Sequence, residues 1–561
     1  MVGKIAAIVL FVAQSAAWAE TATPTPTAPS DTRLVVMIVI DQFRGDYPEA
    51  YKSHFVDGGF KRLMRDGAWM NHAYLQYGCT ATGPGHASLG TGAYPSQHGI
   101  VGNDWILVKE SGEGQYCCGG GEFKLTGLES HMADTSRSPL TLNAPTLGDR
   151  MKEHFGPKCH VWGTALKDRA AILTAGKKAD GAIWWHTPTG NFISSSYYGP
   201  DIPSWVQDLN NERFVDRKFG KEWDRLLDAS AYPTRFLKGC DDDVWRKHNP
   251  EAFPKPLSAG QSEPNAAYYA ALFSSPFGND LVFELAKRAI KAESLGSDAV
   301  PDFLSVCLSS NDVVGHRYGP DSDEVMDCSI RTDRQIAEFL EWLDHEVGLK
   351  NCIVALSSDH GVGPVAEFAV DCTHSGGRHN PGKIEETLEK QLAEKFGKPA
   401  DNRKYVKSMM FPWLYLDEDT VKAQSLSLAE VSRFARDEVV KVDGIEKAFD
   451  IADIESDGFA AQSELHRQIA NSCYPSRSGH VYVHWGRYWA KGRKVAVHGA
   501  AMDYDQHVPV MLMANGVKPG VYEEAVCPTG MVATIAQLLG MPQRSELGGR
   551  PYTMILDPSR K

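Results

Sequence analysis

The sequence predicts an α/β protein built on a doubly wound, mostly parallel sheet, and two observations lead to this prediction. Continuous runs of β-branched and apolar residues recur along the chain, and such runs are typical of strands that are buried on both faces of a parallel sheet. Between them lie segments in which apolar residues recur with the spacing of an amphipathic helix. Strands that alternate with helices in this way indicate one sheet with helices on both faces.

The predicted elements begin at residue 34 and continue into the C-terminal region. Strands are expected at 34–43, 159–166, 302–310, 352–361 and 508–514. Helices are expected at 146–156, 279–293, 322–348 and 532–540.

Two regions interrupt this alternation and are predicted insertions. Residues from about 186 to 275 are rich in Trp, Tyr, Pro and Asn, which indicates a cap-like insertion of irregular structure. Residues from about 400 to 478 contain a strand–helix–strand pattern of their own, which predicts a small α/β insertion.

The first nineteen residues have the composition of a secretory signal peptide. Lys4 is followed by an apolar run and by a small-x-small triplet at 17–19. The run is too short to span a membrane comfortably, so we interpret residues 1–19 as a cleaved signal and not as an anchor. Residues 20–33 form a Thr/Pro-rich linker, and residues 34–561 are expected to form one domain without a membrane span. The sequence therefore predicts a periplasmic or secreted protein.

Charge and cysteine content limit the class of partner. The formal charge of −13 makes a nucleic-acid backbone an unfavourable partner. A phosphorylated small molecule is not excluded, because a bound metal can reverse the local sign of the charge. The eleven cysteines are an odd number, so at least one has no partner within the chain, and the sequence does not define their pairing. No C-x-x-C pair recurs, which argues against a zinc site made of thiolates.

Several predicted strands end in residues that can bind a metal ion. In a doubly wound sheet, sites form beyond the carboxyl ends of the strands. A single Asp at a strand end more often caps a turn, and a single His is more often structural, but several together at one predicted edge favour a metal site. The candidates are Asp41, Asp312, His316, Asp359 and His360, with His498 and His507 near the last strand. Six N and O ligands suit two Zn²⁺ ions with open positions, and two-metal sites serve phosphoryl transfer.

The stretch CTATGPGHASLGTG, residues 79–92, contains several possible nucleophiles. The local sequence does not decide among Cys79, Thr80, Thr82 and Ser88. The segment GPGHASLG can begin a helix with a proline in its first turn. The positive end of such a helix would stabilise an alkoxide and phosphoryl oxygens beside it. An ordinary helix-capping threonine remains the alternative for Thr82.

Six motifs together carry a family resemblance. They are VVMIVIDQFRGDY, TGPGHASLGTGAYPSQHGIVGNDW, LKDRAAILTAG, SSNDVVGH, SSDHG and HGAAMDYDQHVP. Jointly they resemble the alkaline phosphatase superfamily, and most of all the exported bacterial alkaline phosphatases of the PafA and PhoK type, which are related to nucleotide pyrophosphatase/phosphodiesterases. The resemblance covers most of the chain from residue 34 to the C-terminus.

The resemblance implies which residue attacks. Related sulfatases place their Cys or Ser nucleophile in a C-x-P-S-R frame that is followed nine residues later by Thr-Gly. Thr82 stands in this register, since Pro84 lies two residues on and Thr91-Gly92 begins nine residues on. The CYPSR sequence at 473–477 also matches the frame, but it lies far down the chain and lacks the trailing Thr-Gly. It is therefore not expected to carry chemistry.

The resemblance also implies the metal ligands and the residues that contact substrate. One zinc would be held by Asp41, Asp359, His360 and Thr82, and the other by Asp312, His316 and His498, with His507 as the substitute for His498. Asn103, Lys167 and Arg169 match the positions that contact the phosphate oxygens.

The implied activity is hydrolysis of phosphate monoesters through a phosphothreonine intermediate on two Zn²⁺ ions. The substrates would be small molecules, and we expect a monomer with no specific binding of nucleic acid. The first alternative is a phosphodiesterase or nucleotide pyrophosphatase on the same two-zinc core. The second is a non-catalytic secreted metal-binding protein, which the intact nucleophile and ligand set argue against.

Overall fold

The computed structural model describes residues 31–107, 112–132, 135–232, 237, 240, 242–249 and 253–557. The predicted signal peptide at 1–19 and most of the predicted linker lie outside these residues. Within the described part of the chain, no helix has the length and apolar character needed to cross a bilayer.

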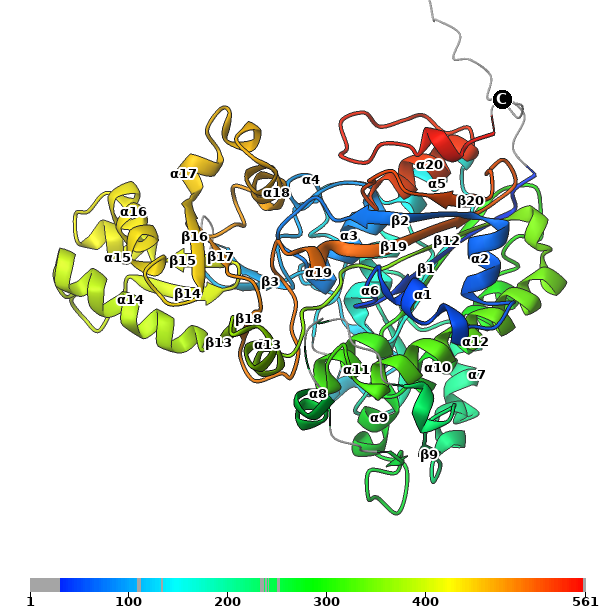
Figure 1. Cartoon of the computed structure of the whole chain (residues 1–561). Helices are drawn as coiled ribbons and strands as arrows, with labels where there is room; N and C mark the ends of the chain where they lie inside the picture. The colour runs from blue at the N-terminus through cyan, green and yellow to red at the C-terminus, as the bar shows by residue number, and fades with distance from the viewer. Residues whose placement is uncertain are drawn as a thin grey trace, which may run out of the picture.

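A ten-stranded sheet forms the centre of the molecule (Figure 1). The order of its strands from one edge to the other is β20 (Gly520–Tyr522), β2 (Ala68–Tyr74), β19 (His507–Met513), β12 (Cys352–Ser357), β1 (Leu34–Ile40), β11 (Asp302–Leu308), β6 (Val161–Ala165), β7 (Gly181–His186), β8 (Asn191–Ser195) and β5 (Leu125–Thr126). All five strands expected from the sequence are present in it.

Strand β1 lies in the middle of the sheet and is buried on both faces. It pairs in parallel with β11 on one side and with β12 on the other. Leu34, Val36 and Ile38 face one hydrophobic core, whereas Val35 and Met37 face a second core on the opposite side. This two-sided burial explains why the sequence of β1 is continuously apolar and does not alternate with polar residues.

Helices cover both faces of the sheet, as the doubly wound prediction requires. One core includes residues of α2 (Phe60–Asp66), α10 (Phe277–Ala292), α11 (Ser310–Tyr318) and α12 (Asp323–Glu346). The other includes residues of α3 (Thr82–Thr91), α5 (Leu147–Phe155), α6 (Asp168–Ala175) and α20 (Gly530–Leu538). The predicted α/β class is confirmed, and each of the four expected helices is present.

The sheet is mixed towards its edges. β19, which the sequence indicated as one more strand of a mostly parallel sheet, runs antiparallel to both β12 and β2. Its apolar run does not reveal direction, because a strand buried on both faces has the same composition in either orientation. The neighbouring strands β12, β1, β11, β6 and β7 are parallel to one another.

The region expected to be a cap at about 186–275 contains short elements. They are β8, α7 (Ser204–Asn211), β9 (Glu222–Trp223), α8 (Asp242–His248), β10 (Lys255–Pro256) and α9 (Ala266–Phe273), of which β8 belongs to the main sheet. A disulfide between Cys240 and Cys372, with Cα atoms 5.1 Å apart, links this region to α13 (Ala366–Thr373). Ion pairs from Lys247 and His248 to Asp371 reinforce the same contact.

The second insertion forms a small lobe at one side of the molecule (Figure 1). Its four-stranded sheet has the order β14 (Val406–Met410), β15 (Trp413–Leu416), β17 (Val481–Trp485) and β16 (Ile445–Asp450). Helices α14 (Pro381–Phe396) and α16 (Leu428–Val439) pack on this sheet around a separate apolar core. Helix α14 and strand β17 lie outside the 400–478 range in sequence but belong to the same core.

Candidate active site

The three central parallel strands deliver polar side chains to one edge of the sheet. Asp41 follows β1, Asp312 lies in the first turn of α11 after β11, and Asp359 with His360 follows β12. His316 is one turn further along α11. Because these strands are neighbours in the sheet, residues that are hundreds of positions apart in sequence meet beyond their carboxyl ends.

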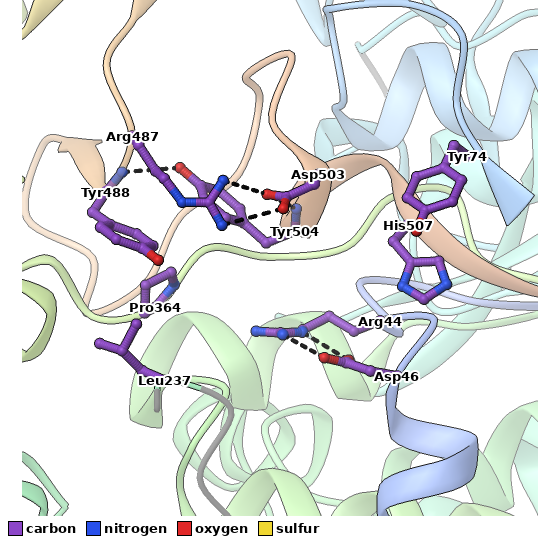
Figure 2. Close-up of a pocket in the computed structure, with 10 residues that line it drawn as sticks. All are labelled: Arg44, Asp46, Tyr74, Leu237, Pro364, Arg487, Tyr488, Asp503, Tyr504 and His507. Atoms are coloured by element: carbon purple, nitrogen blue, oxygen red, sulfur yellow. Dashed lines mark hydrogen bonds and ion pairs between the residues drawn. The ribbon is translucent and has the colours of Figure 1, made fainter. Parts of the chain in front are cut away.

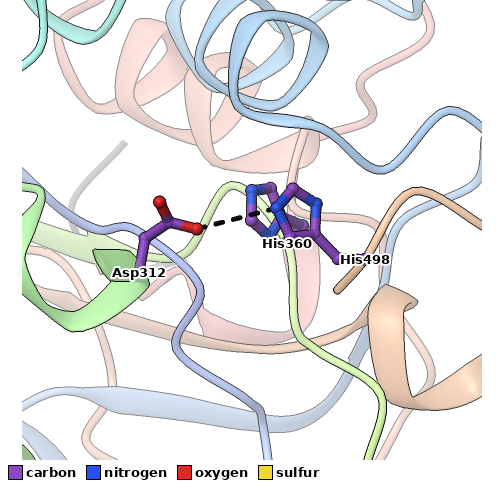
Figure 3. A group of neighbouring side chains, drawn as sticks. All are labelled: Asp312, His360 and His498. Atoms are coloured by element: carbon purple, nitrogen blue, oxygen red, sulfur yellow. Dashed lines mark ion pairs between the residues drawn. The ribbon is translucent and has the colours of Figure 1, made fainter. Parts of the chain in front are cut away.

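His498 reaches the same place from the segment between β18 (Trp489–Lys491) and α19 (Asp503–Gln506). Figure 3 shows its ring beside that of His360, with Asp312 opposite. The ligand atoms of Asp312, His360 and His498 lie within 4.8 Å of one another, and those of Asp41, His86 and Asp359 form a second such group.

His360 connects the two groups. Its Nε2 atom lies 3.3 Å from Asp359 Oδ2 and 3.6 Å from Asp41 Oδ1. Its ring also stacks on His498, with ring centres 3.6 Å apart. His316 Nε2 lies 3.3 Å from Asp312 Oδ1. All six Asp and His residues in the expected ligand set therefore lie in one continuous cluster.

The three imidazoles are held in the same tautomer. The Nδ1 atoms of His316, His360 and His498 lie 2.7, 2.9 and 2.8 Å from the backbone carbonyl oxygens of Ala496, Gly361 and Thr80. A carbonyl oxygen only accepts, so each Nδ1 carries a hydrogen, and in the neutral ring it is Nε2 that presents its lone pair to the carboxylates. Histidines that bind metal ions are oriented by this kind of hydrogen bond.

These lone pairs face carboxylate oxygens, which are themselves acceptors. His360 Nε2 and Asp41 Oδ1 are buried and form no hydrogen bond with a described residue. Burial lowers the pKa of His316 to about 4 and lowers the pKa of His498 well below its usual value, so both rings are neutral at pH 7. Acceptors that face one another in a buried site fit a cation between them, and N and O donors fit Zn²⁺.

Thr82 is the first residue of α3 and is 2% exposed. Its carbonyl oxygen lies 3.0 Å from Nδ1 of His86, which is also 3.1 Å from Asp359 Oδ2. Gly85 permits a close approach here, since a Cβ atom at that position would lie 2.3 Å from the Asp359 carbonyl oxygen. The first turn of α3 is thereby packed directly against the turn that carries two ligand-type residues.

The other candidate nucleophiles of this stretch are engaged elsewhere. Cys79 Sγ donates to the Val101 carbonyl oxygen at 2.8 Å, and burial raises the pKa of its thiol to about 12. Thr80 Oγ1 donates to the Ala500 carbonyl oxygen at 2.9 Å. Ser88 Oγ lies 3.0 Å from His98 Nε2, whose ring accepts through Nδ1 from the Ile100 N–H, so His98 donates to Ser88 and is not a base for it.

The three expected substrate-contacting residues lie around the same cluster. Asn103 Oδ1 accepts from the Gly83 N–H at 2.7 Å, which fixes the amide and leaves its NH₂ group as a donor. Lys167 Nζ lies 2.6 Å from both Asp41 Oδ2 and Asp312 Oδ2, so it joins the two groups. These two carboxylates raise its pKa, although its burial acts in the opposite direction.

Arg169 lies in the first turn of α6, and its buried Nε forms no hydrogen bond with a described residue. Burial acts to lower the pKa of Arg169. The contacts with Tyr116 and Asp168 raise the pKa by more than burial lowers it, so the guanidinium stays charged. Asp168 accepts from the Tyr116 hydroxyl at 2.7 Å and is ion-paired with Arg137. Sequence reasoning missed this supporting pair, because Arg137 lies in a loop and Tyr116 ends the three-residue strand β4 (Gly114–Tyr116), which is too short to show a periodic pattern.

His507, considered as a substitute for His498, lies in a different environment. Its Nε2 atom is 2.8 Å from the Asn71 carbonyl oxygen, and its ring stacks on Tyr74. It lines a cavity of about 160 Å³ together with the ion pairs Arg44–Asp46 and Arg487–Asp503 (Figure 2). The geometry therefore favours His498 over His507 as a member of the cluster.

Two residues of the cluster were not recognised from the sequence. His86 is one helical turn after Thr82 and contacts Asp359, and this i, i+4 spacing was a readable signal. Gln42 directly follows Asp41 and contacts Asp312 and Asp359. Gln42 gave no signal, because an amide next to a strand-terminal Asp is ordinary in a turn.

Comparison with known proteins agrees with this geometry. A family model described as type I phosphodiesterase / nucleotide pyrophosphatase matches residues 35–499. The chain is 34% identical over 516 residues to a Myroides odoratus protein named calcium-transporting ATPase, covering 90% of this chain and 91% of that protein. It is 32% identical to alkaline phosphatase PafA of Elizabethkingia meningoseptica (93% and 94% covered) and 32% identical to alkaline phosphatase PhoV of Synechococcus elongatus (95% and 94% covered).

The fold is also similar to that of a solved structure. The crystal structure of wild-type alkaline phosphatase PafA superposes with a TM-score of 0.83 at 30% identity, covering 94% of this chain and 99% of that chain. Since the family model matches more than half of the chain and the similarity to PafA extends over nearly its whole length, this protein belongs to the type I phosphodiesterase / nucleotide pyrophosphatase family and, within the alkaline phosphatase superfamily, to the PafA type.

Proposed function

We propose that this protein is a zinc-dependent alkaline phosphatase that hydrolyses phosphate monoesters through a phosphothreonine intermediate at Thr82. The observation that carries the proposal is the buried cluster of Asp and His side chains whose lone pairs converge beside the N-terminus of α3. The similarity to proteins named alkaline phosphatase PafA and PhoV supports a phosphoric monoester as the substrate class.

The cluster contains the residues that would hold two metal ions. Asp41, Asp359, His360 and Thr82 would bind one Zn²⁺, and Asp312, His316 and His498 the other. When bound, the ions would supply Lewis-acid stabilisation of the charge on the attacking and leaving oxygens. His360 lies within reach of both groups, so its assignment to the first set rests on the family resemblance.

Thr82 would act as the nucleophile. Its Oγ1 attacks phosphorus, a P–O bond to Thr82 forms, and the P–O bond to the leaving alcohol breaks. Water then attacks the phosphothreonine, releases inorganic phosphate and regenerates the Thr82 hydroxyl. The N-terminus of α3 places its positive end beside this hydroxyl, which favours the anionic nucleophile and the phosphoryl oxygens.

Three side chains would bind the non-bridging oxygens of the phosphoryl group. The Asn103 amide has its NH₂ group free to donate, because its oxygen already accepts from Gly83. Arg169 offers a charged fork whose orientation is set by Tyr116 and Asp168. Lys167 lies between the two carboxylate groups, where it adds positive charge next to a phosphoryl group that bridges them.

Removal of metal is expected to abolish the activity. Dialysis against a chelator should reduce hydrolysis of an aryl phosphate by roughly 10²-fold or more, because the nucleophile and the leaving oxygen both lose their charge stabilisation. Adding Zn²⁺ should restore the rate, and elemental analysis should give two Zn²⁺ per chain. Full activity in a preparation that contains no metal by elemental analysis would contradict the mechanism.

Metal binding is expected to release protons in weakly acidic solution. Burial, together with the charges of Asp359 and Asp312, raises the pKa of Asp41 to about 6. Below that pH, Asp41 carries a proton that a metal ion must displace, so the affinity for Zn²⁺ should fall as the pH decreases through 6. Calorimetric titration of the metal-free protein in buffers with different ionisation enthalpies measures this release. Asp41 is ionised at pH 8 and mostly protonated at pH 5.5, so more protons should be released on metal binding at pH 5.5. Release of the same number of protons at both pH values would contradict the expectation.

Phosphodiester hydrolysis on the same cluster is the second candidate function. The observation that favours it is the description of the matching family as phosphodiesterases. The ratio of kcat/KM for an aryl phosphate and the corresponding bis-aryl phosphate separates the two candidates. A preference for the diester would replace the phosphatase assignment.

Export and assembly remain expectations. We propose that the chain is exported to the periplasm or secreted, because residues 1–19 have the pattern of a cleaved signal. We also expect it to act as a monomer, as the family resemblance implies.

A further inference from the structure

Gln42 lies inside the cluster but is not a metal-ligand type of residue. It follows Asp41 directly and is 1% exposed. Its φ angle is 64°, in the left-handed region that few residues other than glycine adopt. Backbone strain of this kind persists where the surrounding structure imposes it, and it often marks functional sites.

The left-handed conformation lets one residue contact two carboxylates. The backbone N–H of Gln42 donates to Asp359 Oδ1 at 3.1 Å. Its side-chain Nε2 donates to Asp312 Oδ1 at 2.7 Å. Asp359 and Asp312 belong to the two different groups of the cluster. Asp312 Oδ1 is also the oxygen that lies closest to the Nε2 atoms of the two imidazoles at that end.

The orientation of the Gln42 amide is defined by its surroundings. If the amide were turned over, Gln42 Oε1 would face Asp312 Oδ1, and two acceptors would be in contact. With the amide as it stands, Oε1 is buried and forms no hydrogen bond with a described residue. Only the NH₂ group therefore has a defined polar partner, and that partner is a proposed metal ligand.

Gly315 provides the space for this amide. A Cβ atom at position 315 would lie 1.8 Å from Gln42 Oε1, and its three nearest contacts outside α11 are all atoms of the Gln42 amide. Gly315 is in the middle of α11, where alanine would stabilise the helix more than glycine does. The glycine therefore has no local advantage in α11, and its role is to accommodate Gln42.

We propose that Gln42 is a positioning residue for the metal centre, and that Gly315 leaves the space in which the Gln42 amide takes up this position. The Gln42 amide holds the Asp312 carboxylate in the plane in which Oδ1 faces His316 and His498, while the Gln42 N–H holds Asp359. This inference rests on the proposed function, because it assumes that Asp312 binds a metal ion. It concerns residues of this chain that support a ligand and do not touch the substrate.

Zn²⁺ affinity tests the side-chain contact. In Gln42→Ala, the backbone N–H and its bond to Asp359 are retained while the amide is lost. Competition titration of the metal-free protein with a chelator should show that one of two Zn²⁺ ions binds roughly 10- to 100-fold more weakly, the usual effect of losing a residue that orients a ligand. The weakened ion should be the one that is lost in His316→Ala, which removes a ligand from the Asp312 group. The other ion should bind as in the wild type.

A double-mutant cycle tests the role of Gly315. Gly315→Ala alone should weaken the same ion, because its Cβ displaces the amide of Gln42. Gln42→Ala/Gly315→Ala should be no weaker than Gln42→Ala, since the clash is then absent. Gly382→Ala is the matched control, because Gly382 is also helical and a new Cβ there would lie 3.5 Å from Asn380 Oδ1, which is an ordinary van der Waals contact. Gly382→Ala should bind both ions normally.

The outcomes separate this inference from the proposed function. A wild-type protein that binds no Zn²⁺ would overturn both. A wild type that binds two ions, with unchanged affinities in Gln42→Ala, would overturn the positioning role alone. The positioning role would also be overturned if Gln42→Ala weakened the binding of both ions equally, or if the losses of Zn²⁺ affinity in the two single variants added up in the double variant. Circular dichroism of the metal-free variants reports on folding, and a Gly315→Ala protein that unfolds while the double variant folds would still support the steric relation.

Discussion

Replacing Thr82 with alanine is expected to reduce kcat for phosphate monoesters by roughly 10³-fold or more, because no other hydroxyl replaces the nucleophile. Thr82→Ser should retain part of the activity, since it keeps a hydroxyl on the same helical residue. The fold should be unchanged, because the Thr82 side chain does not cap α3. The start of this helix is instead held by the packing of Gly85 against the Asp359 turn. Stopped reactions with labelled substrate should show phosphorylated protein in the wild type and none in Thr82→Ala.

Two neighbouring residues are the controls for this prediction. Cys79→Ala and Ser88→Ala remove two of the other nucleophilic atoms of the stretch, which contact the Val101 carbonyl oxygen and His98. Both variants should keep most of the activity. A lethal effect of either change, together with an active Thr82→Ala protein, would show that the register taken from the family resemblance is wrong.

The double change Lys167→Ala/Arg169→Ala is expected to reduce monoester turnover by roughly 10²-fold or more, since each charged hydrogen bond contributes about 1.5–3 kcal/mol. Diester turnover should change little. A monoester dianion has three non-bridging oxygens and a diester has two, so a donor to the third oxygen benefits only the monoester. Rates on an aryl phosphate and on a bis-aryl phosphate measure the difference.

The structure adds a condition to this second prediction. Lys167 also neutralises Asp41 and Asp312, so its loss could alter metal binding and lower both rates equally. Metal content must therefore be measured alongside the rates, and Arg169→Ala alone should already reduce the monoester rate selectively. Lys177→Ala/Lys178→Ala is the matched control, because it removes the same charge from exposed residues just after α6. Equal losses on both substrates at full metal content would contradict the phosphatase assignment.

The fold was largely predictable because its strongest signals are local. β1 is apolar throughout because both of its faces are buried, and α12 shows its helical period over many turns. Strand direction was not predictable, since the composition of β19 is the same for either orientation. The limits of the small lobe were also out of reach. α14 and β17 join it through tertiary packing, and their own sequences do not say which sheet they accompany.

The sequence was sufficient to predict those residues of the candidate site that follow directly after strands. Asp41, Asp312 and Asp359 each follow a continuous apolar run, so the rule for parallel sheets places them together. The residues that support the cluster carried no such mark. Gln42 acts through a left-handed backbone angle and Gly315 through the space it leaves, and both properties exist only once β1 and α11 are in contact.

The pairing of β1 has a consequence for how the protein is made. Leu34 at the start of β1 has its sheet partners at Asp302 and Cys352, so β1 has no neighbouring strand within the described chain until the segment around Asp302 has been synthesised. Such non-local pairing slows folding and leaves an apolar strand exposed to aggregation during synthesis. His498 is synthesised later still, so the full ligand set cannot assemble until most of the chain has been made.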